Sequence, residues 1–356
     1  MPVLVDGLSA RAGGGIVYLA NLLPALARQP GIGPVRVALA PGAHLGDLLA
    51  GTEVQVHRLD PRTAGLVGRL AWEATRLGPD AGAGVVLSPS AILPRRLPGP
   101  VVAVPHNMLP FRAGGTRNRL RRRSILRTLD WATAAIYVSE EMRREVRRSS
   151  GRPELDRVIP HGVGECFRAP AVSPGGRRSG VVCVADHYPH KRLELLIDAV
   201  RLLAPDAPAL TLIGAGRGRP TATAAGINHE RSLSPAEVAR RLRGAALAVL
   251  PSTIESFGLP ALEAMACATP LLVTDIPSLR EVTGGHAEYL DSDRPEVWAR
   301  RIREMIARPP STSAAREWAL GFTWERTARA TAELLMAADR HHADRGGHAT
   351  PARPGR

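Results

Sequence analysis

The hydrophobic pattern along the chain alternates short apolar runs with amphipathic segments. In the first half, apolar runs of strand length include residues 2–7, PVLVDG, and 101–106, VVAVPH. Segments with helical periodicity at about 65–76, 117–132 and 140–149 separate several of these runs. Such alternation is typical of a mostly parallel sheet that is covered by helices on both faces.

The alternation stops at residues 168–180, which are rich in Pro, Gly and Ser and show no periodicity. Beyond them it resumes with the run GVVCVAD and a helical pattern, so a second doubly wound domain is the simplest interpretation. The sequence therefore predicts one domain over 1–167, a linker over 168–179 and a second domain over 180–322. The tail 341–356 is polar and rich in Gly and Pro, and we expect it to be disordered.

Composition excludes several classes of protein. With 356 residues and 44% hydrophobic content, the chain can bury a full core and is not an intrinsically disordered protein. No run approaches the ~18 apolar residues that a membrane span requires, and the first residues do not resemble a secretory signal, so we expect a cytoplasmic protein. Cys166, Cys183 and Cys267 lie far apart without metal-ligand spacing, which disfavours disulfides and zinc.

The formal net charge of +14 raises the question of an anionic partner, and the candidates are nucleic acid, anionic lipid or a phosphorylated substrate. The arginines are spread along the whole chain, and only residues 117–127, RNRLRRRSILR, form a dense cluster. This cluster lacks the interleaved aromatic residues of nucleic-acid sites, so we do not expect a nucleic-acid partner. Peripheral contact of 117–127 with an anionic membrane, at its inner face, stays open, as does a solvated face in an arginine-biased protein.

Lys191 is the only lysine, because every other basic residue among the 47 Lys and Arg is arginine. A retained lysine indicates a site that needs a compact ammonium group rather than the wide planar fork of arginine. Chance survival of one lysine is the alternative, and composition does not decide between the two.

Two groups of residues follow predicted strands, where ligands bind in open parallel sheets. Gly13, Gly14 and Gly15 follow the first strand, so their bare amides can receive a phosphate or a sugar hydroxyl, although a plain tight turn is the simpler explanation of this motif taken alone. His106 ends the run 101–106 and is expected at the same edge of the sheet.

The segment IESFGLPALEA places two carboxylates around a helix start. Glu255 lies on a loop after a strand, and Glu263 lies about one turn into a helix that Pro260 begins. The amides of Phe257, Gly258 and Leu259 can point at an anion near the helix N-terminus. The arrangement suits a ligand with both a diphosphate and hydroxyl groups, and its alternative is two surface glutamates around a capped helix.

Taken together, these motifs resemble those of the retaining glycosyltransferases of family 4. The resemblance runs from about residue 3 to 340, and the E-x7-E segment with its EAMA run is the most specific part. The motifs that carry it, in family order, are GGG at 13–15, PHNMLPF at 105–111, YVSEEMR at 137–143, VIPHGV at 158–163, YPHKRLELLIDA at 188–199 and PSTIESFGLPALEAMACATPLLVTD at 251–275. The resemblance implies a GT-B fold: two Rossmann-like doubly wound domains facing a central cleft, with a helix over 323–340 crossing back to the first domain.

The resemblance also implies a reaction and a role for each residue. It implies retaining transfer of a hexose-type sugar from a nucleotide-diphospho-sugar to a glycan, lipid-linked or small-molecule acceptor, with no cofactor and no metal because the protein supplies the cation. The catalytic residues would be His106, Lys191 and Glu255. The donor-binding residues would be Gly14, Gly15, Lys191, Ser256, Phe257, Gly258, Leu259 and Glu263, with Lys191 on the diphosphate and Glu263 on the ribose.

Three features depart from the family pattern or compete with it. Asp186 stands where many relatives carry an arginine, and Ala268 stands where a glycine is usual. The triplet Asp291 to Asp293 resembles a DxD metal motif, but it lies in a predicted turn after the core and is interpreted as solvated. The loss of the arginine is the best support for an alternative from another class, a non-catalytic GT-B subunit that binds a glycan or protein partner. The presence of Lys191, Glu255 and Glu263 argues against it.

Overall fold

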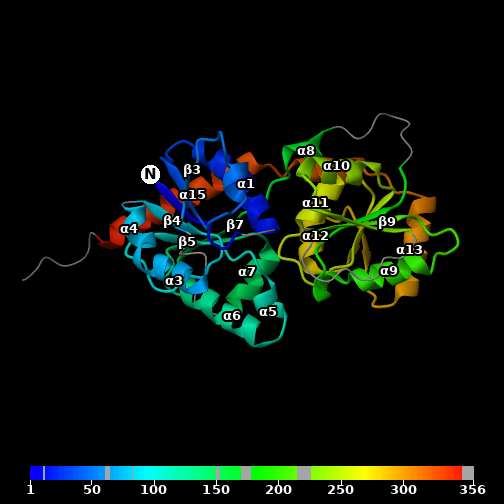
Figure 1. Cartoon of the computed structure of the whole chain (residues 1–356), viewed down its shortest axis with the longest axis horizontal. Helices are drawn as coiled ribbons and strands as arrows, with labels where there is room; N and C mark the ends of the chain where they lie inside the picture. Colours follow the sequence, from blue (N-terminus) through cyan, green and yellow to red (C-terminus); the bar gives the residue numbers. More distant parts are fainter. Residues whose placement is uncertain are drawn as a thin grey trace, which may run out of the picture. The chain divides into compact units, whose positions relative to one another are not determined.

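The structure is a computed structural model that describes residues 1–10, 13–60, 65–82, 84–149, 153–169, 178–214 and 226–346 (Figure 1). The chain forms two compact units. Unit 1 comprises Met1–Val138, Met142–Pro160 and the chain from Glu325 onwards, and unit 2 comprises Ser139–Glu141 and His161–Trp324. Most of the predicted linker, residues 170–177, lies outside the described residues.

Unit 1 is built on a parallel sheet with the order β3-β2-β1-β4-β5-β6-β7 in the described residues. β1 pairs with β2 on one side and with β4 on the other, so the direction of winding reverses between β1 and β4. The strands are β1 (Val3–Asp6), β2 (Val35–Leu39), β3 (Gln55–Arg58), β4 (Val85–Ser88), β5 (Val101–Ala103), β6 (Ala134–Tyr137) and β7 (Leu155–Val158).

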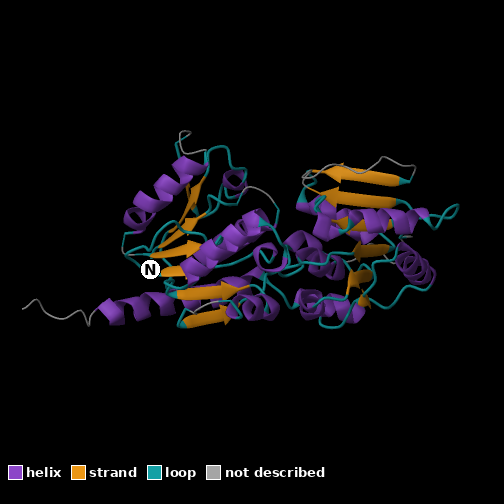
Figure 2. Ribbon diagram, turned by 90° about the horizontal axis from the view of Figure 1, so that it is seen from below, coloured by secondary structure: helices purple, strands orange, loops and turns teal. Residues whose placement is uncertain are grey.

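Helices lie on either side of these strands (Figure 2). They are α1 (Gly14–Ala27), α2 (Leu45–Leu48), α3 (Leu66–Thr75), α4 (Leu77–Ala81), α5 (Leu109–Arg112), α6 (Thr116–Leu129), α7 (Glu140–Arg147) and the long C-terminal α15 (Trp324–Gly346). Apolar positions of α1, such as Leu19, Leu22 and Leu26, are fully buried despite the internal Pro24.

Helix α15 packs on unit 1 from the far end of the sequence. Arg157 of β7 donates to Glu333 at 2.7 Å, and His341 Nε2 lies 2.9 Å from a carboxylate oxygen of Glu154. The helix continues to Gly346, so residues 341–346, which the sequence predicted to be disordered, are helical. Ala343 and Arg345, before the two glycines, are good helix formers, and Glu154 contacts His341 and Arg345. The helix therefore continues beyond the predicted end.

Unit 2 repeats the architecture with a parallel sheet in the order β10-β9-β8-β11-β12-β13. Its strands are β8 (Val181–Val184), β9 (Leu210–Gly214), β10 (Ile227–Arg231), β11 (Leu247–Leu250), β12 (Leu271–Thr274) and β13 (Glu288–Leu290). Its helices are α8 (Glu165–Arg168), η2 (Pro189–Lys191), α9 (Leu193–Arg201), α10 (Pro235–Gly244), α11 (Leu259–Ala266), α12 (Pro277–Thr283), α13 (Pro295–Ala307) and α14 (Ser313–Leu320).

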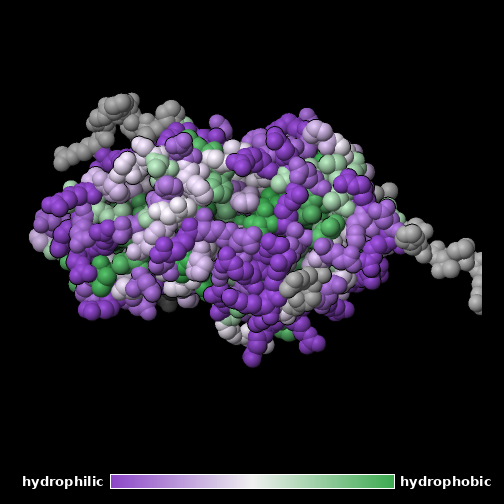
Figure 3. All heavy atoms as spheres, turned by 180° about the vertical axis from the view of Figure 1, so that it is seen from behind, coloured by the Kyte–Doolittle hydropathy of each residue, from purple (hydrophilic) through white to green (hydrophobic). Residues whose placement is uncertain are grey.

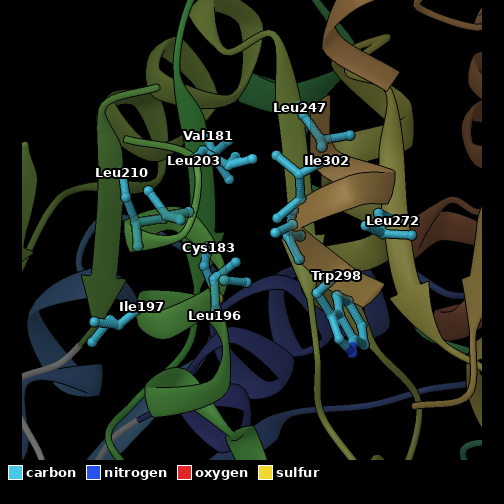
Figure 4. Packing of buried hydrophobic residues seen from close by; sticks show 14 of the residues in the cluster. Val181, Cys183, Leu196, Ile197, Leu203, Leu210, Leu247, Leu272, Trp298 and Ile302 are labelled. Carbon is cyan, nitrogen blue, oxygen red and sulfur yellow. The ribbon is translucent and has the colours of Figure 1, made fainter. Parts of the chain in front are cut away.

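One face of the unit 2 sheet packs on α9 and α13. Trp298 and Ile302 of α13 and Leu196 of α9 are fully buried against Cys183 and Leu247 of the sheet (Figure 4). The Trp298 indole donates to the Ser292 carbonyl at 2.8 Å, so its polar group is satisfied. All three cysteines are free thiols, in agreement with the sequence prediction.

The predicted fold class is confirmed, because both units are doubly wound parallel sheets of the Rossmann type. In such sheets the carboxyl ends of the strands share one edge, which in unit 1 follows Asp6 and Ser88 and in unit 2 follows Val184 and Leu250. None of the described helices is long and apolar enough to cross a membrane. The face drawn in Figure 3 is mostly hydrophilic, with small hydrophobic patches.

Candidate active site

Lys191 and Glu255 come together at the carboxyl edge of the unit 2 sheet. Lys191 ends the one-turn helix η2 after β8, and Glu255 lies on the loop after β11, which pairs with β8. Lys191 Nζ donates to Glu255 Oε1 at 2.6 Å, and the two side chains are only 18% and 10% exposed. The Thr253 amide also donates to the His190 carbonyl at 2.9 Å, so the two loops are tied together by side chain and backbone.

Glu263 is in a different electrostatic state from Glu255. It lies in the middle of α11 and is buried, and burial raises the pKa of its carboxyl to about 8. The group is therefore mostly neutral at pH 7, and a neutral carboxyl both donates and accepts a hydrogen bond. Such a group suits a hydroxyl-bearing ligand better than a cation.

The turn that leads into α11 requires a glycine. Gly258 has φ of +100°, and a Cβ placed there would lie 2.9 Å from Leu279 Cδ2. Leu259 follows as the first residue of α11, and no side chain caps the helix. Pro260 has no amide hydrogen and the Ala261 amide donates to the Gly258 carbonyl at 3.0 Å, so within the described residues the Leu259 amide is the one left open at this helix start. Phe257 is buried against the ring of His161, at 4.9 Å between centroids, which fixes the path of the turn.

The departure at Asp186 and the acidic triplet Asp291 to Asp293 both have clear positions in unit 2. Asp186 follows β8, next to His187, whose ring stacks on that of His229 with centroids 5.4 Å apart. Asp293 of the acidic triplet accepts from Arg192 at 2.6 Å. Among the described residues no group of three or more His, Cys, Asp or Glu is arranged to hold a metal ion.

The predicted site residues of unit 1 are His106, Gly14 and Gly15. His106 Nδ1 lies 3.0 Å from the Pro89 carbonyl and its ring packs edge-on against Tyr18, with centroids 4.2 Å apart. Burial lowers the pKa of His106 to about 4, so the ring is neutral at pH 7 and donates its Nδ1 proton to that carbonyl. Gly14 and Gly15 open α1, and a Cβ at Gly14 would meet none of the described residues within 4 Å.

The sequence analysis missed a buried charged cluster at the same edge of unit 1. Asp6 ends β1 and Glu73 lies on α3, both fully buried, and Arg69 Nε donates to Glu73 Oε1 at 2.6 Å. Burial first, and then the charge of Asp6, raises the pKa of Glu73 to about 7; burial also raises the pKa of Asp6. An acidic residue at the end of the apolar run 2–7 was the available signal, because strand ends place side chains at the ligand edge.

Comparison with known proteins gives two family matches. Residues 178–308 match the family described as Glycosyl transferases group 1, and residues 12–164 match Glycosyltransferase Family 4. The two matches together cover most of the chain.

Curated relatives bear the names of glycosyltransferases. A D-inositol 3-phosphate glycosyltransferase of Geodermatophilus obscurus is 32% identical over 230 residues, which are 56% of this chain and 51% of the relative. A GDP-mannose-dependent alpha-(1-6)-phosphatidylinositol dimannoside mannosyltransferase of Mycobacterium tuberculosis is 36% identical over 102 residues, 28% of this chain and 27% of the relative. The chain thus spans about half the length, or less, of these relatives.

Solved structures are similar in fold at low sequence identity. The Anabaena protein HepE, solved in complex with UDP and glucose, superimposes with a TM-score of 0.67 at 18% identity and covers 98% of this chain and 99% of its own. WaaG, a glycosyltransferase involved in lipopolysaccharide biosynthesis, gives 0.65 at 12% identity, covering 97% and 99%.

Proposed function

This chain belongs to the family 4 glycosyltransferases, and from that premise we propose that it moves a hexose-type sugar from a nucleotide-diphospho-sugar to an acceptor hydroxyl, with retention and without a metal ion. The observation that carries the proposal is the pair of Lys191 and Glu255 beside the uncapped N-terminus of α11. A fixed ammonium and the Leu259 amide at the start of a helix form a site for a diphosphate.

The proposed chemistry uses groups that unit 2 supplies. Departure of the nucleoside diphosphate builds negative charge on its phosphate oxygens, and Lys191 with the Leu259 amide of α11 would stabilise that charge. Glu263, mostly neutral at pH 7, would bind the ribose hydroxyls, and Glu255 would orient both Lys191 and the donor sugar.

Retention is proposed to proceed by front-face substitution. The acceptor oxygen forms a bond to the anomeric carbon as the bond from that carbon to the phosphate oxygen breaks, and the acceptor proton passes to the departing phosphate oxygen. His106 and the backbone at Gly14 would contribute on the side of unit 1, where a neutral imidazole accepts a hydrogen bond from a sugar hydroxyl.

The acceptor class is proposed from the relatives. One is named for D-inositol 3-phosphate and another for phosphatidylinositol dimannoside, which supports small-molecule and lipid-linked acceptors in the test panel. The second name also supports GDP-mannose as one donor to include.

The test is turnover by the purified chain with UDP-, GDP- and ADP-sugars, with and without these acceptors. Under the proposal, one donor is consumed in excess EDTA at the same rate as without it, and the product keeps the donor's anomeric configuration by NMR. Loss of turnover in EDTA that Mg²⁺ or Mn²⁺ restores would contradict the protein-cation mechanism. Binding of a glycan without consumption of any donor would favour the non-catalytic subunit instead.

A specific observation supports peripheral membrane contact as an additional property. Helix α6 carries six arginines and no acidic residue in its sequence TRNRLRRRSILRTL, and Arg119, Arg123 and Arg127 follow one another at one-turn spacing on an exposed face. Like charges at this spacing destabilise a helix, and each arginine near an anionic surface is worth about 1 kcal/mol. These arginines line a cavity of about 710 Å³ with Arg122, which donates to Ser149 at 2.7 Å.

Sedimentation with anionic liposomes tests this contact. A variant with Arg119→Glu, Arg123→Glu and Arg127→Glu should lose most of its binding, whereas the matched variant with Arg300→Glu, Arg303→Glu and Arg308→Glu, exposed positions at α13, should keep it. Equal sedimentation of the two variants would show that only net charge matters.

A further inference from the structure

A second cavity lies at the amino edge of the unit 1 sheet, away from the edge that holds Asp6 and His106. Its volume is about 330 Å³, and its walls include Arg95, Arg96, Trp131, Thr133 and His342. The loop with the two arginines leads into β5, and Trp131 and Thr133 lead into β6, which is parallel to β5. Both segments therefore meet at the amino edge of the sheet. His106 lies beyond the opposite end of β5, and because a strand rises roughly 3.3 Å per residue, the length of β5 separates it from this cavity.

The floor of this cavity is held by the sheet itself. The Thr133 amide donates to the Val101 carbonyl at 2.9 Å, and the Val101 amide donates to the Thr133 hydroxyl oxygen at 3.2 Å. Leu97 is buried beneath the loop. The cavity is thus formed by backbone that the strand pairing fixes, and it is a preformed site.

Positive charge in this cavity has no recorded counter-ion in the part of the chain that the structure describes. Arg95 and Arg96 are adjacent and exposed, and neither takes part in any of the ion pairs found there. Glu154, the acid in contact with this end of α15, is already paired with His341 and Arg345. Two neighbouring guanidinium groups repel each other, so a bound anion would remove an unfavourable interaction.

Arginines with a structural role in this protein look different. Arg178 donates to the Ala268 carbonyl at 2.6 Å, and Arg316 donates to the Ala266 carbonyl at 2.8 Å, so each guanidinium group is bonded to a backbone carbonyl oxygen. Arg95 and Arg96 instead line the same cavity as the half-buried indole of Trp131. A pair of cationic forks beside a flat aromatic face binds an anion that carries a ring.

We propose that this cavity binds a small phosphate ester with a single ring, of sugar-phosphate size, at a site separate from the one that would hold the nucleotide-sugar. Arg95 and Arg96 hold the phosphate, Trp131 packs on the ring, and His342 and the Thr133 hydroxyl contact the remaining oxygens. The volume lies at the lower end of small-molecule sites, which fits one ring and one phosphate and not a nucleotide-sugar.

The experiment uses the full chain, with glucose 6-phosphate, inorganic phosphate and glucose as probes. Glucose 6-phosphate should change tryptophan fluorescence saturably, inorganic phosphate should compete with it more weakly, and glucose should have no effect at the same concentrations. Arg95→Ala with Arg96→Ala should weaken binding of glucose 6-phosphate at least about tenfold, because two charge-assisted contacts are lost. The control Arg300→Ala with Arg303→Ala should bind like the wild type.

Calorimetry separates the role of the indole from that of the charge. Trp131→Phe should abolish the fluorescence change and retain the heat of binding, since a phenyl ring still packs on the sugar. No saturable binding of glucose 6-phosphate up to about 10 mM, or equal affinity in wild type and the Arg95, Arg96 variant, overturns the proposed site. Inorganic phosphate that binds as tightly as glucose 6-phosphate overturns the assignment of a ring-bearing ligand.

Discussion

Replacement of Lys191 by Ala or Arg is the most direct test of the candidate active site. Lys191 Nζ lies 2.6 Å from Glu255 Oε1 in a pair that is mostly removed from water. Lys191→Ala leaves the Glu255 carboxylate without its cation, which we expect to cost about 1–3 kcal/mol of folding free energy, below the 3–5 kcal/mol of a fully buried pair. The fold should survive this loss.

Lys191→Ala should lose most of its turnover although it loses only part of its folding free energy. Removal of one group that stabilises developing charge lowers kcat by about 10²- to 10³-fold, so Lys191→Ala should lose at least about 10²-fold. Lys191→Arg keeps the charge, but its head group is wider and its donors are fixed in a plane, so we expect a loss of about tenfold or more. Arg201→Lys, at the exposed end of α9, is the control for an exchange between arginine and lysine at the surface, and it should leave kcat unchanged.

The assay is release of the nucleoside diphosphate from the donor that the panel identifies, with circular dichroism to confirm folding. The double variant Lys191→Ala, Glu255→Ala should recover part of the lost stability, because it no longer holds an unpaired carboxylate, and none of the lost turnover. Wild-type turnover of Lys191→Ala would refute the role of the ammonium. Wild-type turnover of Lys191→Arg would mean that the single lysine survived by chance.

Three further predictions concern stability and pH. Burial raises the pKa of Glu263 from 4.5 to about 8, so this carboxyl favours the folded state at low pH, and that stability is lost as pH rises from 4.5 through 8. The Tm of Glu263→Gln should therefore rise relative to that of the wild type progressively between pH 5 and pH 8. A Tm difference that stays constant over this range would contradict the buried neutral acid. Because the pKa of His106 is lowered from 6.5 to about 4, its contribution is present above pH 6.5 and lost as pH falls toward 4; His106→Gln should flatten the acid side of a Tm against pH curve, and an unchanged curve would exclude this histidine as the cause. Gly258→Ala should lower the free energy of unfolding in urea by about 1–3 kcal/mol, because φ is +100° and the new Cβ meets Leu279. Gly285→Ala is the control, since φ is +84° there but the new Cβ meets none of the described residues within 4 Å, and its free energy of unfolding should fall less. Equal losses in the two variants would contradict the steric argument.

The sequence predicts the central strands and misses three edge strands, β7, β10 and β13. Runs such as 2–7 and 245–252 are apolar because β1 and β11 are covered on both faces. β10 and β13 lie at the two edges of the unit 2 sheet, and β10 reads INHER, with three of its five residues charged or histidine. Edge strands carry polar residues for solubility, so their hydrophobic pattern is weak and gives no signal.

For the site, the sequence identifies residue types at strand ends but cannot assign their electrostatic states. Glu255 and Glu263 are equivalent in the E-x7-E pattern, yet the first pairs with Lys191 across 64 residues of sequence, and the second is buried inside a helix and mostly neutral at pH 7. The cluster of Asp6, Arg69 and Glu73 likewise depends on β1 and α3 packing together. Burial and long-range pairing set these states, and neither is visible in local spacing.

Arginine usage explains why a net charge of +14 is a poor guide to the partner of this protein. Many of the arginines perform structural work: Arg147 forks onto Asp156, and Arg316 donates to carbonyl oxygens of Ala266 and Arg168. These guanidinium groups are already bonded and offer little to a polyanion. Exposed arginines that also line a cavity lie on the row of α6 and at Arg95 and Arg96. Anion binding should therefore depend on where a mutated arginine lies, so that equal changes in net charge at α13 and at α6 have unequal effects.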